Sequence, residues 1–274
     1  MKKTARTRGR FDIRHGKLFD AWAGEYDRFR PSYPDSAIND VVRLSGLTPL
    51  SRLLEVGCGT GKATAKFASR GYAVHCVDPG DRLIRFAQRN CRSWPRVSFT
   101  LGKFEDVLFR PRSYDLVYSA QAFHWVEPRI RLKKAGSLLP RGGSLALIYN
   151  FPALPRGPLL RTLASTIQEE SCGELSAWSY EDEVARWTDE ISRCRLFSGL
   201  TVRRHRWLKR YNAEEYIGLF RTFSDFLILR KPLQRKVAQA IQRTIEEHGG
   251  FVRRPYECVL IHARRNDKPV RKTW

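Results

Sequence analysis

The sequence lacks several features that would assign it to a class at once. It has no apolar run near the roughly 20 residues that a membrane-spanning helix needs. Its first residues are basic but lack the apolar stretch of a secretory signal. The six cysteines are scattered without a C-x-x-C pair, so we predict neither a metal site nor a disulfide framework. These absences favour a soluble protein of the reducing cytoplasm.

Acidic residues are scarce relative to basic ones. The 274 residues include 50 Lys and Arg but only 28 Asp and Glu, which gives a net charge of +22. Residues 1–17 carry seven basic side chains and one acid, and residues 264–272 carry five and one. We expect a disordered basic arm over residues 1–17 and a basic tail over residues 264–274. Such ends bind nucleic acid in some proteins, but more often they keep a chain soluble.

The sequence does contain a short apolar strand pattern that ends in three alternating glycines. Residues 53–56 read Leu-Leu-Glu-Val, and Gly57, Gly59 and Gly61 follow before a helical pattern begins at Lys62. Glycine accepts positive φ and lets backbone N–H groups approach a ligand with no side chain between. We therefore predict a nucleotide-like cofactor at the carboxyl end of this strand.

The residues around this turn indicate which cofactor it binds. Dinucleotide-binding folds use G-x-G-x-x-G, whereas here Lys62 stands at the position of the third glycine. Glu55, two residues before the first glycine, would repel a pyrophosphate but suits a cationic amino group. Asp78 ends the second strand pattern, where a carboxylate can accept from ribose hydroxyls; capping the next helix is the alternative. S-adenosylmethionine has a ribose, a positive charge and no phosphate, so it fits, whereas NAD fits poorly.

Further motifs, in order along the chain, resemble those of the class I S-adenosylmethionine-dependent methyltransferases. They are Y-x-x-x-R-P-x-Y-P at residues 26–34, V-D-P-G at 77–80, G-K-F-E-D at 102–106 and S-A-Q-A-F-H-W at 119–125. The first motif is similar to that of a small-molecule branch, the methyltransferase type 11-like proteins that resemble trans-aconitate methyltransferase. The resemblance covers about residues 19–263 and does not specify a substrate.

The resemblance implies further cofactor contacts. Tyr26 and Arg30 would close over the cofactor, and the Arg30 guanidinium would bind the cofactor's carboxylate. The alternative is that Arg30 is solvated on an entry loop. Phe104 would hold adenine through its backbone N–H, and Glu105, or the acid after it, would accept from the exocyclic amine. Ala120, at the end of the fourth strand, would be a further cofactor contact.

Candidate catalytic and substrate residues follow in the later motifs. His124 would lie beside the methyl group, where it could take a proton from the acceptor because its usual pKa is near neutrality. Alternatively His124 and Trp125 only shape the wall of the pocket. Trp125 is a candidate substrate contact, as are Arg221 and Ser224 from a segment resembling the family's cap. Three phenylalanines of that segment, Phe220, Phe223 and Phe226, are expected to form apolar core.

The succession of patterns predicts an α/β fold: a doubly wound, seven-stranded, mostly parallel sheet of the Rossmann-like methyltransferase type. The resemblance adds an antiparallel last strand and a helical cap. Predicted strands cover 52–56, 72–77, 97–101, 114–119, 144–149, 201–208 and 256–263. Predicted helices cover 18–30, 35–44, 62–70, 81–91, 127–138, 159–171, 180–193, 212–222 and 231–248. We expect one domain over 18–263, with N-terminal helices 18–46, the cofactor-binding sheet 52–150, and the cap with the last strands 155–263.

The preferred function is methyl transfer to a small acceptor held under the cap, and the positive charge of the body would suit an anionic one. A nucleic-acid methyltransferase is the first alternative, because of the charge of +22. Against it, no Asn- or Asp-Pro-Pro-aromatic motif follows the fourth strand, and there is no Pro-Cys nucleophile. The second alternative is a non-catalytic protein that binds S-adenosylmethionine. The sequence does not specify the methylated atom or the oligomeric state.

Overall fold

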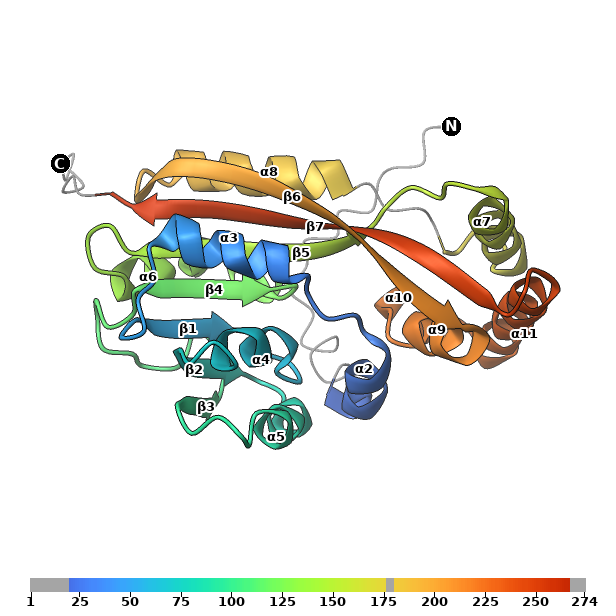
Figure 1. The fold of residues 1–274 in the computed structure, drawn as a ribbon, viewed down its shortest axis with the longest axis horizontal. Helices are drawn as coiled ribbons and strands as arrows, with labels where there is room; N and C mark the ends of the chain where they lie inside the picture. Colours follow the sequence, from blue (N-terminus) through green and yellow to red (C-terminus); the bar gives the residue numbers. More distant parts are fainter. Residues whose placement is uncertain (1–19, 176–179, 267–274) are drawn as a thin grey trace.

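The computed structural model describes residues 20–175 and 180–266 (Figure 1). Within these residues seven strands form one sheet in the order β3-β2-β1-β4-β5-β7-β6. The strands are β1 Arg52–Val56, β2 Ala73–Asp78, β3 Val97–Leu101, β4 Leu116–Ala120, β5 Ser144–Pro152, β6 Phe197–Asn212 and β7 Phe251–Arg265. The predicted fold class is confirmed. The predicted arm, residues 1–17, and most of the predicted tail, residues 267–274, lie outside the described residues.

Helical segments separate most of the strands, as predicted. The α-helices are α2 Ala23–Phe29, α3 Asp35–Ser45, α4 Lys62–Ala68, α5 Asp81–Asn90, α6 Pro128–Leu138, α7 Pro158–Glu170, α8 Tyr180–Arg193, α9 Ala213–Phe220, α10 Ser224–Ile228 and α11 Lys231–Glu247, and η1 Phe123–Trp125 is a 3-10 turn. No helix in the described part of the chain is long and apolar enough to cross a membrane.

The order of the strands creates a crevice at the carboxyl ends of the central strands β1 and β4. Strands β1 to β5 are parallel, and β7 runs antiparallel between β5 and β6. The chain moves outward from β1 to β3 and then returns to place β4 on the other side of β1. Loops that leave β1 and β4 therefore diverge, and ligands of open α/β sheets bind at such a switch point.

Apolar side chains alternate between two cores, one on each face of the sheet. Helices α3, α4 and α5 cover one face, where Ile38 and Phe67 are fully buried. Helices α6 and α8 cover the other face, where Trp187 is fully buried. Adjacent residues of β1 show the period of two, because Leu53 belongs to the first core and Leu54 to the second. A parallel sheet covered on both faces follows from this pattern.

A third core forms the cap. Strands β6 and β7 run beyond β5, and residues 208–212 pair with residues 251–255 as a two-stranded ribbon. Helices α7, α9, α10 and α11 gather around the end of this ribbon (Figure 1). Phe226 of α10 is buried in this core, and Phe220 and Phe223 pack against the core. The helical cap is confirmed, and α7, which precedes β6, is part of it.

The last two strands are longer than predicted. A strand predicted over 201–208 covers 197–212, and one predicted over 256–263 covers 251–265. Gly199 and Pro255 look like strand boundaries in the sequence. In the structure a break in register between Ser198 and Thr201 accommodates Gly199, and Pro255 sits where the ribbon leaves the main sheet. The first two residues of the predicted tail therefore belong to β7.

One helix in the cap was also placed incorrectly. The helix predicted over 212–222 ends at Phe220, and a separate short helix, α10, begins at Ser224. The start was marked correctly, because Asn212 and Glu215 form a capping box at the beginning of α9. Between the two helices the chain turns, and this turn changes the direction of the residues that follow Phe220.

Candidate active site

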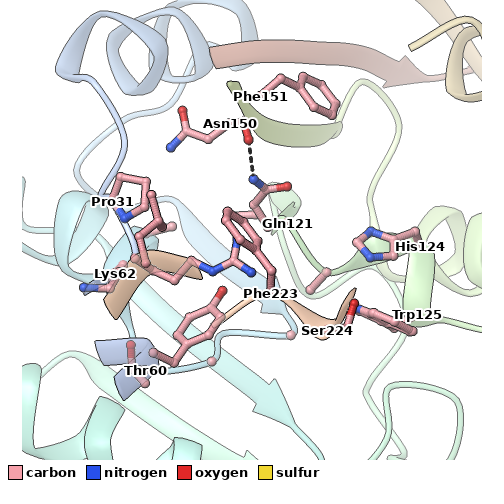
Figure 2. A pocket seen from close by; sticks show the side chains of 18 of the residues that line it. Pro31, Thr60, Lys62, Gln121, His124, Trp125, Asn150, Phe151, Phe223 and Ser224 are labelled. Atoms are coloured by element: carbon pink, nitrogen blue, oxygen red, sulfur yellow. Dashed lines mark hydrogen bonds between the residues drawn. The ribbon is translucent and has the colours of Figure 1, made fainter. Parts of the chain in front are cut away.

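The carboxyl ends of β1, β2 and β4 open into a cleft of about 1660 Å³ that continues under the cap (Figure 2). A pocket for a single drug-sized ligand has about 300–1,000 Å³, so the cleft has room for a cofactor and a second molecule. Predicted site residues that line it are Tyr26, Arg30, Glu55, Gly57, Gly59, Asp78, Phe104, Glu105, Ala120, His124, Trp125 and Ser224. Gly61 and Arg221 do not line it.

The glycine loop, residues 57–61, needs glycine both for its positive φ angles and because neighbouring segments approach it closely. Gly57, Gly59 and Gly61 have φ of +73°, +54° and +82°, which favours glycine at all three positions. A Cβ on Gly57 would lie 2.3 Å from the Cβ of Ala122, in the loop after β4. A Cβ on Gly61 would lie 3.2 Å from Ala87 in α5. The first glycine thus lets the two loops of the crevice touch, and the third lets α4 pack on α5.

Asp78 fixes the position of the glycine loop. One carboxylate oxygen accepts from the backbone N–H of Gly59 at 2.8 Å, and the other accepts from that of Gly80 at 2.8 Å. The side chain is buried on the cleft wall, and burial raises its pKa to about 6. Each oxygen keeps a second lone pair, so the ribose contact predicted for Asp78 stays a prediction compatible with this geometry.

Glu55 lies deeper in the same wall. Its Oε2 accepts from the hydroxyl of Thr64 at 2.5 Å and from that of Tyr118 at 2.8 Å. Burial raises the pKa of Glu55 to about 8, against the lowering effect of the two hydrogen bonds. A cationic group bound nearby would favour the charged carboxylate. Glu55 is therefore suited to the amino group that the sequence assigns to it.

The segment around α2 crosses from the glycine loop to the cap. The Nζ of Lys62 donates to the backbone oxygen of Asp27 at 2.6 Å, which ties α4 to this segment. Arg30 Nη2 donates to the backbone oxygen of Thr222 at 2.8 Å, and its guanidinium lies 4.4 Å from the ring centroid of Phe223. Tyr26 lies on the other side, with its ring centroid 5.3 Å from the same guanidinium. Arg30 is therefore held in the cleft, and the solvated alternative is wrong.

The loop after β3 contributes Glu105 rather than the acid that follows it. Glu105 lines the cleft, and its Oε1 accepts from the backbone N–H of Glu127 at 2.7 Å. Asp106 is exposed and lies outside the cleft. The ring of Phe104 is buried beside Phe109. Of the two acids considered for the adenine amine, Glu105 is the one in position.

The loop after β4 forms the opposite wall, beginning at Ala120. His124 lies here with Nδ1 buried and without a hydrogen-bond partner in the described part of the chain. Burial, with Arg186 and Arg131 nearby, lowers the pKa of His124 to about 3. This pKa differs from the usual near-neutral value chiefly because the ring is removed from solvent. A neutral imidazole with a free nitrogen can still hydrogen-bond a ligand.

The candidate substrate contacts differ in where they lie. Trp125 and Ser224 both line the cleft (Figure 2), and the ring centroid of Trp125 lies 4.8 Å from that of His124. Arg221 is exposed outside the cleft, so a substrate contact from this residue is wrong. Arg221 continues the helical backbone at the end of α9, and its side chain is exposed to solvent there.

Several cleft residues were missed from the sequence. Gln121 has φ of +61°, uncommon for a residue other than glycine, and its Nε2 donates to the backbone oxygen of Asn150 at 2.7 Å (Figure 2). Asn150 in turn donates to the backbone oxygen of Ser32 at 2.9 Å and so joins β5 to the N-terminal segment. A polar residue near the carboxyl end of a buried strand is a signal that could have identified Asn150. Nothing local identifies Gln121.

Orphaned polar atoms test whether this end of the cleft fits S-adenosylmethionine. Arg30 Nε and Thr60 Oγ1 are buried and have no hydrogen-bond partner among residues 20–175 and 180–266. Both residues line the cleft, together with the buried carboxyls of Glu55 and Asp78. A ligand with a carboxylate, a cationic amine and a ribose would pair these groups without placing a phosphate against an acid. The donor set fits this cofactor.

Comparison with known proteins agrees with the geometry. Residues 53–143 match the methyltransferase domain family. An uncharacterized methyltransferase of Mycobacterium tuberculosis is 34% identical over 132 residues, which are 48% of this chain and 51% of the relative. A probable S-adenosylmethionine-dependent methyltransferase of Saccharomyces cerevisiae is 31% identical over 131 residues, 46% of this chain and 45% of the relative. The chain spans about half the length of the curated relatives it matches.

Solved structures support the same fold. A chain from Anaeromyxobacter dehalogenans, named as a candidate Type II methyltransferase, superposes with a TM-score of 0.63 at 22% identity, over 86% of this chain and 98% of that one. A phosphoethanolamine N-methyltransferase of Haemonchus contortus in complex with S-adenosylhomocysteine has a TM-score of 0.55 at 14% identity, over 97% of this chain and 62% of that one.

Residues 53–143 are therefore a methyltransferase domain, and the chain is similar to S-adenosylmethionine-dependent methyltransferases in sequence and in fold. S-adenosylmethionine, the cofactor predicted from the glycine loop, agrees with these similarities. The resemblance to the trans-aconitate-like branch stays a prediction.

Proposed function

We propose that this methyltransferase transfers the methyl group of S-adenosylmethionine to a small molecule held under the cap. The observation that supports this most directly is a single cleft that runs from the glycine loop to the cap helices. Its volume exceeds what one ligand of moderate size needs. The methyl acceptor would therefore lie in the part of the cleft that the cap covers.

The cofactor end of the cleft has a distinct role for each residue. Arg30 would pair with the carboxylate of the cofactor and Glu55 with its amino group. Asp78 would accept from the ribose while it holds the glycine loop through Gly59. Glu105 would face the adenine. With these assignments, the sulfonium would face the loop that carries His124.

Bound S-adenosylmethionine supplies an electrophilic methyl group on a sulfonium that leaves readily. The task of the chain is to exclude water and hold the acceptor atom in line with that methyl group. Leu219, Phe220 and Phe223 line the cap side of the cleft and provide an apolar wall. Trp125 and Ser224 would contact the acceptor at the same junction.

His124 is better suited to orienting the acceptor than to removing its proton. A group whose pKa is about 3 is a weak base at neutral pH. Its unpaired Nδ1 can accept a hydrogen bond from a hydroxyl or amine and fix the direction of the attacking lone pair. A carboxylate or another ionised nucleophile would need no base.

The experiment that tests this function separates it from the two alternatives. Purified protein is incubated with tritiated S-adenosylmethionine and either a small-molecule extract or total RNA. We expect label in the small-molecule fraction and none in RNA. Label in RNA that falls steeply with salt would favour the nucleic-acid alternative. Cofactor binding by calorimetry with no label in either fraction would favour a non-catalytic binder. The Gly57→Ala variant is the matched negative control.

A further inference from the structure

Arg254 is a partly buried arginine of the cleft with no acidic partner. It lies on the ribbon of β7, one residue before Pro255, and it lines the cleft beneath the cap. Its Nη1 donates to the hydroxyl of Tyr216 at 2.8 Å. Its guanidinium also lies 5.3 Å from the ring centroid of Tyr216, 5.8 Å from that of Phe220 and 5.7 Å from that of Tyr256. In the described part of the chain no carboxylate pairs with it.

Two other arginines of the cleft are neutralised by neighbouring acids, and a third, Arg82, is exposed to solvent. Arg131 forms a two-point pair with Glu190, and Arg186 pairs with Glu183. Arg30 also lacks an acidic partner, but it is assigned to the carboxylate of the cofactor. A partly buried cation without a counter-charge is unfavourable unless something supplies the missing negative charge. Arg254 therefore has binding capacity that the cofactor assignment does not use.

Tyr256 and its neighbour Tyr211 cannot supply that charge. Burial raises the pKa of Tyr256, and its hydroxyl lies 2.8 Å from that of Tyr211, so both stay protonated at neutral pH. The hydroxyl oxygen of Tyr216 already accepts a hydrogen bond from Arg254. Among the described residues the hydroxyl hydrogen of Tyr216 has no acceptor. Tyr216 can therefore donate to the same oxyanion as the guanidinium.

We propose that Arg254 and the hydroxyl of Tyr216 form an oxyanion subsite that anchors an anionic methyl acceptor under the cap. The inference rests on the proposed function, and it narrows the acceptor to molecules that carry a carboxylate, phosphate or sulfate group. A planar guanidinium forms charge-assisted, often bidentate bonds with such groups. The aromatic rings around it exclude water and strengthen this pairing.

The test uses binding rather than turnover, with S-adenosylhomocysteine saturating so that the cofactor carboxylate already occupies Arg30. Succinate, inorganic phosphate, sulfate and the neutral succinamide are titrated by calorimetry. We expect at least one anion to bind and succinamide not to bind. Arg254→Gln should weaken the bound anion about tenfold or more, the scale of a lost charge-assisted hydrogen bond. The anion that binds distinguishes a carboxylate site from a phosphate or sulfate site.

Two further variants exclude a general effect of charge or of folding. Arg253→Gln removes the same charge one residue away, from an exposed side chain, and should change anion affinity less than twofold. Arg254→Lys retains the charge and should bind between wild type and Arg254→Gln. All variants should bind S-adenosylhomocysteine as wild type does.

Three outcomes overturn the subsite: equal anion affinity of wild type and Arg254→Gln, equal losses from Arg253→Gln and Arg254→Gln, or no binding of any anion. Failure of the proposed function is a different result, namely no heat with S-adenosylhomocysteine. In that case the anion titrations are repeated without it, and the same comparison of Arg254→Gln with Arg253→Gln decides the subsite.

Discussion

Gly57 offers the sharpest prediction, because two separate physical effects act on it. An alanine there would keep a φ of +73° and would place its Cβ 2.3 Å from the Cβ of Ala122. The left-handed conformation costs roughly 1–2 kcal/mol for a residue with a Cβ. The overlap adds about 1–3 kcal/mol, because the loops after β1 and β4 must separate. We expect Gly57→Ala to lower the free energy of unfolding by about 2–5 kcal/mol.

A matched control isolates the overlap. Gly71 has φ of +85°, but a Cβ there would meet no atom within 4 Å. Gly71→Ala should therefore lose only the conformational part, roughly 1–2 kcal/mol, and leave cofactor affinity unchanged. Both variants are compared by urea unfolding and by calorimetry with S-adenosylhomocysteine. Equal destabilisation of the two variants, or normal cofactor binding by Gly57→Ala, would refute the close approach of the two loops.

The remaining predictions concern the ionisable groups of the cleft. Glu55 has a pKa of about 8 in the folded protein, so it holds a proton that the unfolded chain releases near pH 4.5. The free energy of unfolding should therefore fall by up to about 1.4 kcal/mol per pH unit as the pH rises from about 5 to 8. Glu55→Gln should flatten this slope in urea unfolding, and an unchanged slope would contradict the raised pKa. Asp78→Ala should weaken cofactor affinity by about 1–3 kcal/mol in calorimetry, while the exposed Asp106→Ala should not; equal effects would remove Asp78 from the site. His124→Ala should lower kcat by less than about 10²-fold and leave the pH–rate profile above pH 5 unchanged, whereas a larger loss with an altered profile would identify a base.

The sequence predicted those parts of the site that depend on local chain geometry. The alternating glycines and Glu55 lie where β1 turns into α4, and Asp78 lies where β2 turns into α5. Each of these positions follows from a local strand-to-helix pattern. The bounds of β1 and β3 agree with the predicted ranges for the same reason, since short apolar runs end at clear turn signals.

Features that depend on packing between distant segments could not be predicted. Gln121 adopts positive φ because it bridges β4 to Asn150 on β5, and no residue beside it signals this. Arg254 enters the cleft because the ribbon of β6 and β7 extends past Pro255, which the sequence marks as a strand boundary. Arg221 was a candidate because its segment resembles the family's cap, but its side chain at the end of α9 is exposed outside the cleft.

The central claim is that a sulfonium nucleoside binds where the loops after β1 and β4 meet. Calorimetric titration of the wild-type protein with S-adenosylmethionine and with NAD tests it directly. We predict saturable binding of S-adenosylmethionine that Gly57→Ala abolishes, and no binding of NAD. Absence of heat with S-adenosylmethionine at millimolar concentration, or tighter binding of NAD, would contradict the claim.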